Sequence, residues 1–183
     1  MSIRKGLHYL LQAFQELDLP DAELWLVGPP TAETELLLKK YRSQRIVLRG
    51  TFPQAELRRE YARASVFCLP SIEEGFAMVI TQAMACAVPV IASENTTGTD
   101  LIREGVDGYV IPIRDVEALK QRVMTLYRDP ERRREMGRNA RRRIETAGTW
   151  DHYGTRLEDE YRRLIEKGCA SRRHEPFGPG GAR

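Results

Sequence analysis

Five short apolar runs, separated by segments with helical periodicity, set the tightest limit on how this chain can fold. The runs lie within 22–28, 45–50, 65–70, 88–93 and 109–113, and they lack the apolar–polar alternation of half-buried strands. Strands that are apolar throughout are covered on both faces, as in a parallel sheet with helices on each side. Their alternation with helices predicts βαβ units and a doubly wound α/β sheet.

The intervening segments have the spacing and the capping residues of helices. In "GLHYLLQAFQEL" the apolar side chains Leu7, Leu11 and Phe14 share one face. Thr31 is placed to cap a helix over 31–41, and Asp115 is placed to cap a helix over 115–129. Further helices are predicted over 53–64, after Gly75, over 99–108, and in the charged segments that begin at 129 and 149.

The composition is that of a soluble globular protein. With 183 residues, 42% of them hydrophobic and 30% charged, the chain suits one domain of ordinary size. We assign residues 1–168 to this domain and residues 169–183, which are rich in Gly and Pro, to a disordered tail. No apolar run reaches the roughly 18 residues of a membrane span, which leaves only peripheral membrane contact open.

The cysteines and the amino-terminal residues indicate a cytoplasmic protein. Cys68, Cys86 and Cys169 are odd in number and lack the spacing of a metal site, so we expect reduced thiols and no bound metal. The opening residues, "MSIRKGLHYLLQAF", are amphipathic and lack the cleavage site of a signal peptide.

The basic residues do not indicate a nucleic-acid partner. A net charge of +3 is too small to suggest one by itself. Seven arginines lie between 132 and 143, but Glu131 and Glu135 stand among them and no aromatic platform is near. A solvated helix face explains these arginines better, and we expect no nucleic acid.

Two carboxylates and a glycine open the most hydrophobic region of the chain, "PSIEEGFAMVITQAMACAVPVIAS". Free amides at the start of a helix after Gly75 would form a site for an anion such as phosphate. A carboxylate at Glu74 repels phosphate unless it points past it, and sugar hydroxyls are strong donors to carboxylates. Gln82 lies eight residues later, about 12 Å away along a helix, so a nucleotide sugar has the length to reach both.

Structural explanations of the same residues stay open. Ser71-x-x-Glu74 matches a capping box, which starts a helix without binding a ligand. Gln82, taken alone, is more often a helix amide with a satisfied hydrogen bond than a ligand contact.

The stretch resembles the signature of the group 1 retaining glycosyltransferases, the glycogen-synthase-like enzymes of the GT-B fold. Their pattern is roughly Pro-Ser-x-x-Glu-Gly-Phe-Gly, then Glu-Ala-Met-Ala, then Pro-Val-Ile-Ala. Other pieces are similar in the same order, including "RKGLHYLLQAF", "LWLVGPP", "VLRGTFPQAELRREYARASVFCLPS", "LIREGVDGYVIPIRDVEAL" and "DPERRREMGRNARRR". The resemblance covers about residues 3–165 and implies the carboxyl-terminal, Rossmann-like domain that binds the nucleotide-sugar donor.

The resemblance also implies roles for individual residues. Glu74 corresponds to the catalytic-site acid that contacts the donor sugar, and Lys5 to a lysine that neutralises the phosphates. Gly75, Phe76 and Ala77 correspond to the loop whose amides meet the diphosphate.

Two further positions are implied in binding the nucleoside. Gln82 occupies the place of the residue that grips the ribose, and the turn that contains Thr51 lies where the base is held. The resemblance implies transfer of a sugar from a UDP-, GDP- or ADP-linked donor with retained anomeric configuration, without a metal or another cofactor. Electrostatic stabilisation of the departing diphosphate does much of the work in such a reaction.

The chain departs from the family pattern in three ways. Gln82 stands where the family has a second Glu, and Ala77 where it often has Gly, which lets the backbone approach phosphate closely. The third departure is that the acceptor-binding first domain is missing, and with it the first strand of the second domain. We therefore expect an uncovered sheet edge, and a half-enzyme that is inactive without an acceptor domain, supplied in the same polypeptide or by a separate chain.

A non-catalytic module is the alternative. It would bind a nucleotide sugar or dock a partner protein without transferring a sugar. The missing acceptor half and the change at Gln82 favour it.

Overall fold

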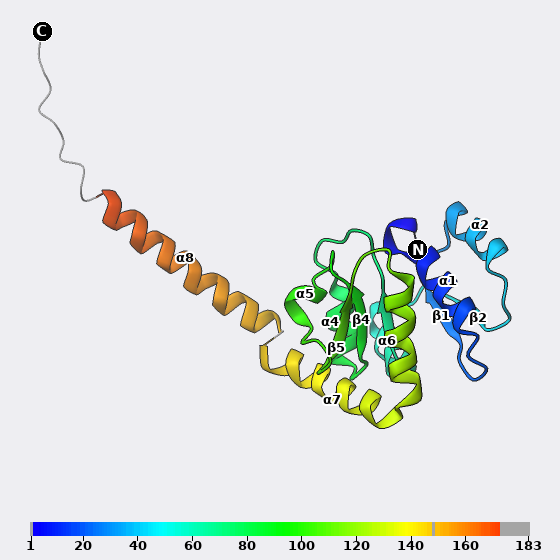
Figure 1. The fold of residues 1–183 in the computed structure, drawn as a ribbon. Helices are drawn as coiled ribbons and strands as arrows, with labels where there is room; N and C mark the ends of the chain where they lie inside the picture. Colours follow the sequence, from blue (N-terminus) through cyan, green and yellow to red (C-terminus); the bar gives the residue numbers. More distant parts are fainter. Residues whose placement is uncertain (1, 148, 173–183) are drawn as a thin grey trace, which may run out of the picture. The chain divides into compact units, whose positions relative to one another are not determined.

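Strands and helices alternate along the chain as the sequence predicts. The structure, a computed structural model, describes residues 2–147 and 149–172. Within them the strands are β1 (Leu24–Val27), β2 (Ile46–Gly50), β3 (Phe67–Leu69), β4 (Val90–Ser93) and β5 (Gly108–Ile111). The helices are η1 (Ile3–Lys5), α1 (Leu7–Leu17), α2 (Ala32–Lys40), α3 (Gln54–Arg63), α4 (Met78–Ala85), α5 (Gly98–Leu101), α6 (Val116–Arg128), α7 (Pro130–Ala147) and α8 (Trp150–Arg172). The predicted α/β class is confirmed (Figure 1).

The strands form two parallel sheets rather than one. β1 pairs with β2, with Leu24 opposite Ile46, while β3, β4 and β5 pair in that order. Every pair is parallel, so the carboxyl ends of paired strands lie at the same edge of their sheet. The predicted parallel pairing is confirmed, but the five strands fall into one sheet of two strands and one of three.

The central strand β4 is buried on both faces. All four of its residues are buried. Val90 and Ala92 pack in a cluster with residues of α4 and α7, whereas Ile91 packs in a second cluster with residues of α1 and α6. Because helices cover both faces, this strand needs apolar side chains at successive positions, which explains its lack of alternation in the sequence.

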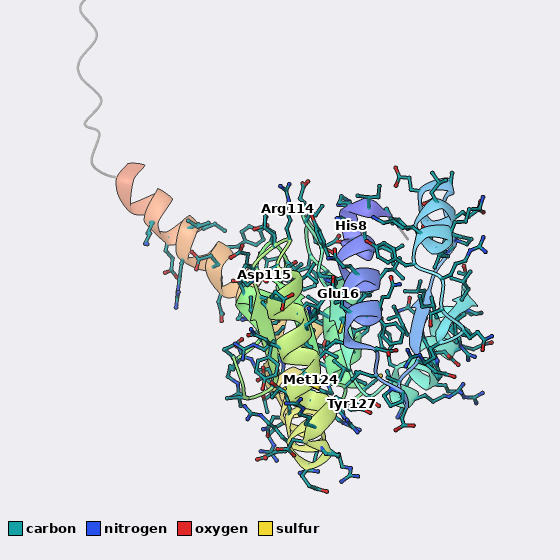
Figure 2. The ribbon with its side chains drawn as sticks, turned by 45° about the vertical axis from the view of Figure 1, so that its right-hand side comes forward. His8, Glu16, Arg114, Asp115, Met124 and Tyr127 are labelled. Carbon is teal, nitrogen blue, oxygen red and sulfur yellow. The ribbon has the colours of Figure 1, made fainter. Side chains whose placement is uncertain are left out.

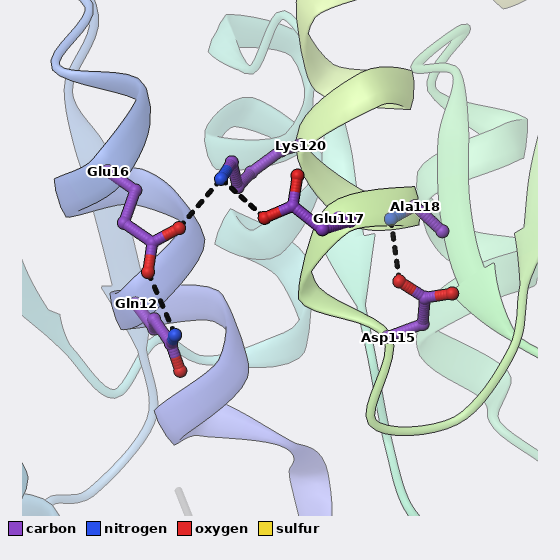
Figure 3. A network of polar contacts seen from close by, with 6 residues as sticks. All are labelled: Gln12, Glu16, Asp115, Glu117, Ala118 and Lys120. Atoms are coloured by element: carbon purple, nitrogen blue, oxygen red, sulfur yellow. Dashed lines mark hydrogen bonds and ion pairs between the residues drawn. The ribbon is translucent and has the colours of Figure 1, made fainter.

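Helices α1 and α6 lie side by side on one of these faces (Figure 2). Lys120 on α6 donates to Glu16 on α1 at 2.7 Å and to Glu117 at 2.7 Å, and Gln12 donates to Glu16 at 2.8 Å (Figure 3). The hydrogen bond from Lys120, and to a lesser extent the hydrogen bond from Gln12, lowers the pKa of the Glu16 carboxyl group. The network is exposed to solvent, so we expect it to contribute little to stability.

Two predicted helix caps are present. The Thr34 amide donates to Thr31 Oγ1 at 3.3 Å at the start of α2. The Ala118 amide donates to Asp115 Oδ1 at 2.8 Å at the start of α6 (Figure 3). Each side chain satisfies an amide that the helix itself leaves unpaired, so both predictions are confirmed.

One predicted helix is shorter than expected. The segment 99–108 was expected to be helical, but α5 ends at Leu101. Asp107 is buried and accepts hydrogen bonds from the amide and the Nε of Arg103, each at 2.7 Å. Gly105 has a φ of +73°, a conformation that suits glycine. This local network turns the chain toward β5 before a second helical turn can form.

The free cysteines agree with the expectation of unbridged thiols. Cys68 and Cys86 form no disulfide, and the side chain of Cys169 lies outside the described residues. Burial raises the pKa of Cys68 to about 12 and also raises the pKa of Cys86.

The chain divides into two units, residues 1–145 and 146–183. The second unit contains α8, which confirms the predicted charged helix, and the His152 amide donates to Thr149 Oγ1 at 3.3 Å near its start. Of the predicted tail, residues 169–172 belong to α8 and the rest lie outside the described residues. Across 2–147 and 149–172, no helix combines the length and the apolarity needed to cross a bilayer.

Candidate nucleotide-sugar site

The loop between β3 and α4 is held from two sides. On one side the Ile72 amide donates to the Arg4 carbonyl at 2.9 Å. On the other side the Glu74 amide donates to the Asn95 carbonyl at 3.1 Å, and Asn95 Nδ2 donates to the Ile72 carbonyl at 3.0 Å. The loop therefore has a fixed path between the amino-terminal segment and the segment that follows β4.

Gly6 allows the amino-terminal segment to lie directly against this loop. Its φ is +70°, and a Cβ atom added to it would lie 1.8 Å from the Pro70 carbonyl oxygen. No other residue fits here without moving one of the two segments. The lysine–glycine pair of the sequence thus places Lys5 beside the end of β3.

Lys5 and Glu74 form an ion pair. The Lys5 side chain is 37% exposed and the Glu74 side chain is 11% exposed, so the carboxylate is the more enclosed partner. The sequence analysis predicted both residues as ligand contacts, and the structure brings them together. Their meeting depends on the contacts of Gly6 and Ile72, which fix the two segments relative to each other.

The start of α4 is capped by backbone carbonyls and not by the side chain of its N-cap residue. The N-cap is Ala77, and the Met78 and Ile80 amides donate to the carbonyls of Phe76 and Ala77, each at 2.9 Å. The alternative explanation of Ser71 and Glu74 as a capping box does not hold, because α4 begins only at Met78. A Cβ added to Gly75 would have no atom within 4 Å, so space is open beside the loop.

Two side chains of the predicted diphosphate loop differ in exposure, one facing solvent and the other the core. Phe76 is 63% exposed. Ala77 is 3% exposed, and its methyl group packs in the core cluster with residues such as Ile80. The alanine that replaces the family's glycine therefore uses its side chain for packing.

Gln82 lies in a different environment from Lys5 and Glu74. Its Oε1 accepts a hydrogen bond from the Tyr61 hydroxyl at 3.3 Å. It lines a cavity of about 550 Å³ whose other lining residues are Gln54, Leu57, Arg58, Tyr61, Ala62, Ala85, Cys86, Arg141 and Glu145. None of the other predicted site residues lines this cavity.

The expected spacing between Glu74 and Gln82 rested on one continuous helix. Since α4 begins at Met78, only the second half of that stretch is helical, and the 12 Å rise estimated for a full helix does not apply. Burial raises the pKa of Tyr61 to about 12, so its hydroxyl stays protonated and remains a donor to Gln82 near neutral pH.

The turn predicted to hold the base is anchored by Arg49. The Arg49 guanidinium donates to Glu60 at 2.8 Å and 3.2 Å and lies over the Trp25 ring, 4.7 Å from its centroid. Thr51 follows on the exposed side of the turn. These contacts hold the turn in place through Arg49. Thr51 takes no part in them, and its side chain is exposed.

Two buried hydroxyl groups, Ser71 Oγ and Thr97 Oγ1, have no hydrogen-bond partner among the residues that the structure describes. Sequence reasoning missed Asn95, whose backbone and side chain both hold the loop. The signal available was the polar run "SENTTGT" directly after β4, at the edge where parallel strands end.

In the part of the chain that the structure describes, no group of three or more His, Cys, Asp or Glu side chains could hold a metal ion.

The relatives of this chain include several glycosyltransferases. A family model described as "Glycosyl transferases group 1" matches residues 1–143. The chain is 30% identical over 164 residues to a GDP-mannose-dependent monoacylated alpha-(1-6)-phosphatidylinositol monomannoside mannosyltransferase of Corynebacterium glutamicum, covering 84% of this chain and 43% of that protein. It is 32% identical over 171 residues to the GDP-mannose-dependent alpha-(1-6)-phosphatidylinositol monomannoside mannosyltransferase of Mycolicibacterium smegmatis, covering 85% and 44%.

Solved structures show the same fold. Sucrose-phosphate synthase from Thermosynechococcus elongatus superposes with a TM-score of 0.79 at 28% identity, over 91% of this chain and 44% of that one. The C-terminal domain of a group 1 glycosyl transferase from Francisella tularensis superposes with a TM-score of 0.69 at 19% identity, over 80% of each chain. The chain thus spans less than half the length of the curated relatives named above, and it has the fold of the carboxyl-terminal half of a GT-B enzyme. The chain belongs to the group 1 glycosyltransferase family.

Proposed function

We propose that this chain is the donor-binding half of a retaining glycosyltransferase. It would hold a nucleotide-diphosphate sugar while an acceptor domain, in the same polypeptide or in a separate chain, presents the acceptor. The observation that carries the proposal is the contact of Lys5 with Glu74, in the loop that leads into α4. A cation for phosphate and a carboxylate for sugar hydroxyls are thereby brought to one place.

The proposed binding mode follows from these charges. The diphosphate would lie between Lys5 and the backbone amides of Gly75 to Ala77, where the start of α4 also favours a negative charge. Glu74 would accept hydrogen bonds from the sugar. Lys5 and the amides supply positive charge where negative charge develops on the leaving diphosphate. We therefore propose transfer without a metal or another cofactor.

Nucleoside recognition is assigned to Gln82 and to the turn at Thr51. Since Gln82 Oε1 accepts from Tyr61, its Nε2 group is left to donate to a ribose hydroxyl. Two relatives are named as GDP-mannose-dependent enzymes, which makes GDP-mannose the first donor to test. We further propose a cytoplasmic location, where the free thiols of Cys68 and Cys86 stay reduced.

Isothermal titration of the full chain tests the proposal. GDP-mannose, UDP-glucose and ADP-glucose are titrated in buffer that contains EDTA, and we expect one of them to bind. Lys5→Met should weaken that binding by about ten-fold, because a charge-assisted contact to phosphate is lost. Lys39→Met, an exposed lysine on α2, is the matched control and should have no effect. Failure of all three nucleotides to bind folded protein would remove the proposal.

A non-catalytic module is the second candidate. It is favoured by the neutral amide at Gln82, whose oxygen is already bonded to Tyr61. To separate the two, the chain is mixed with, or fused to, the amino-terminal domain of the Corynebacterium glutamicum relative and supplied with the donor that binds. Transfer of sugar with retained anomeric configuration, read by NMR of the product, excludes the non-catalytic candidate. Binding without transfer in the fused protein favours it.

A further inference from the structure

The cavity that Gln82 lines is otherwise unused by the proposed nucleotide-sugar site. It has a volume of about 550 Å³ and lies between residues of α3, α4 and α7. Small-molecule sites in proteins typically have volumes of about 300 to 1,000 Å³. All of its lining residues belong to residues 1–145, so the cavity lies within one unit of the chain.

The inner wall of the cavity is apolar. Tyr61 and Cys86 line it and also pack against a buried core cluster that contains Ile80. Leu57 lines the same cavity, four residues before Tyr61 and therefore on the same side of α3. A ligand in the cavity would thus contact apolar atoms on its inner side.

Two arginines stand at the cavity. Arg58 of α3 and Arg141 of α7 both line it. In the described part of the chain, the Arg58 guanidinium forms no ion pair with a carboxylate. Arg141 donates from its Nε to Glu145 Oε1 at 2.7 Å, and both of these side chains are more than half exposed. The Arg58 guanidinium is therefore available to a negatively charged ligand.

The Cys86 thiol lies near both of these positive charges. Its Sγ is 3.9 Å from the Arg58 carbonyl oxygen. Burial raises the pKa of the thiol, whereas the charges of Arg58 and Arg141 act on that pKa in the opposite direction. Such an effect requires a charged group nearby. The two guanidinium groups therefore approach the same part of the cavity wall.

The charges of the lining residues favour a ligand with one negative charge. Arg58 and Arg141 are positive, and Glu145 carries the sole carboxylate among the lining residues, all of which the structure describes. One net positive charge matches a carboxylate better than a phosphate group, which carries close to two negative charges. Guanidinium groups also bind carboxylates through paired, charge-assisted hydrogen bonds.

We propose that this cavity binds a small organic carboxylate, in which one carboxylate group is joined to a compact aromatic or branched aliphatic body. The carboxylate binds Arg58, with Arg141 as a second positive charge, and the apolar body contacts Leu57 and Tyr61. Burial of the apolar body and the charge-assisted hydrogen bonds both stabilise the complex. The inference goes beyond the proposed function and does not depend on it, because Lys5 and Glu74 do not line the cavity.

NMR titration of the ¹⁵N-labelled full chain, without nucleotide, tests the inference. The ligands are phenylacetate and isovalerate, their neutral amides, and acetate, which lacks an apolar body. We expect at least one of the two larger carboxylates to shift the amide signals of Tyr61, Ala85 and Cys86 in a saturable way. Its amide and acetate should each bind about ten-fold more weakly, since the first lacks the charge and the second lacks the apolar contacts.

Two variants and a control locate the binding site. Arg58→Gln should weaken carboxylate binding by about ten-fold, because a charge-assisted hydrogen bond is lost. Glu145→Gln should strengthen binding by about two-fold, because it releases Arg141 from an exposed ion pair. The control is Arg59→Gln, the next residue of α3, which is exposed and does not line the cavity, and it should have no effect.

Several results would overturn the inference. Absence of saturable binding by both larger carboxylates would do so, as would equal binding of a carboxylate and its amide. Acetate that binds as tightly as the larger carboxylates would refute recognition of an apolar body. Equal losses in Arg58→Gln and Arg59→Gln would mean that only general surface charge matters, which contradicts a site at Arg58.

Discussion

The Lys5 ammonium pairs with the Glu74 carboxylate across 69 positions of the sequence. Both were predicted to contact a nucleotide sugar, through different parts of it. In the structure each satisfies the charge of the other. A bound donor would offer phosphate to Lys5 and hydroxyls to Glu74, so both groups keep a partner in the bound state.

Loss of the Glu74 carboxylate is expected to weaken binding of the whole donor more than binding of its diphosphate part. For Glu74→Gln, titration calorimetry should show affinity for GDP-mannose, or for whichever donor binds, reduced by about ten-fold or more. Affinity for the nucleoside diphosphate alone should hold or rise, because Lys5 is released from its partner. Glu73→Gln, an exposed neighbour, is the control. Equal losses for donor and diphosphate would contradict a sugar contact by Glu74.

Restoring an acid at position 82 is expected to strengthen ribose binding. In Gln82→Glu the carboxylate accepts from the ribose hydroxyls and from Tyr61, which stays protonated since its pKa is about 12. Affinity for the nucleoside diphosphate should rise by about three-fold to ten-fold. The gain should vanish for the 2′-deoxy nucleotide. The control is Gln121→Glu, on the exposed side of α6, which should change the affinity for neither the nucleoside diphosphate nor its 2′-deoxy form. A gain in affinity by Gln82→Glu that persists with the 2′-deoxy nucleotide would argue against a ribose contact.

Gly6→Ala should destabilise the fold. The new Cβ would meet the Pro70 carbonyl oxygen at 1.8 Å, and the residue already has a φ of +70°. We expect a loss of about 2 to 4 kcal/mol in the free energy of unfolding, measured with urea. Gly75→Ala, where no atom lies within 4 Å of the added Cβ, should stay within about 0.5 kcal/mol of the parent. Similar losses in the two variants would mean that the loop and the amino-terminal segment are not held together as described.

Burial of Cys68 is expected to make stability fall at alkaline pH. Its pKa in the folded protein is about 12, against an ordinary value of 9.0, so the unfolded chain loses the proton first. The protonated Cys68 thiol contributes fully to the free energy of unfolding below the pKa of the unfolded chain. This contribution is lost as the pH rises toward the pKa of the folded protein, by up to about 1.4 kcal/mol per pH unit. Urea unfolding from about pH 8 to about pH 10 should show this fall, and Cys68→Val should reduce it. The control is Cys86→Ser, which should retain most of the fall of the free energy of unfolding with pH. An unchanged fall in Cys68→Val would show that Cys68 is not the group responsible.

The elements of the fold could be predicted from local signals. Apolar runs without alternation identified the buried strands, and Thr31 and Asp115 identified two helix starts, because caps and burial patterns act within a few residues. The short α5 was missed because buried Asp107 competes with the helix for the Arg103 amide. That contact depends on burial, which the sequence of the segment does not show.

The arrangement of the site could be predicted only in part. A likeness of motifs placed Lys5 and Glu74 in one site, but it did not reveal that they form an ion pair with each other. The bond between Gln82 and Tyr61 was not foreseen either, since these residues meet through the packing of α3 against α4. The division of the sheet likewise depends on pairing between distant segments.

An ¹⁵N NMR titration of the full chain with the donor that binds tests the central claim most directly. We expect the amide signals of Gly75, Phe76 and Ala77 to shift together with those of Lys5 and Gly6, while the signals of Tyr153 and Leu157 on α8 stay in place. Binding that leaves the Gly75 to Ala77 amides unchanged and shifts only residues around another cavity would contradict the proposed diphosphate site.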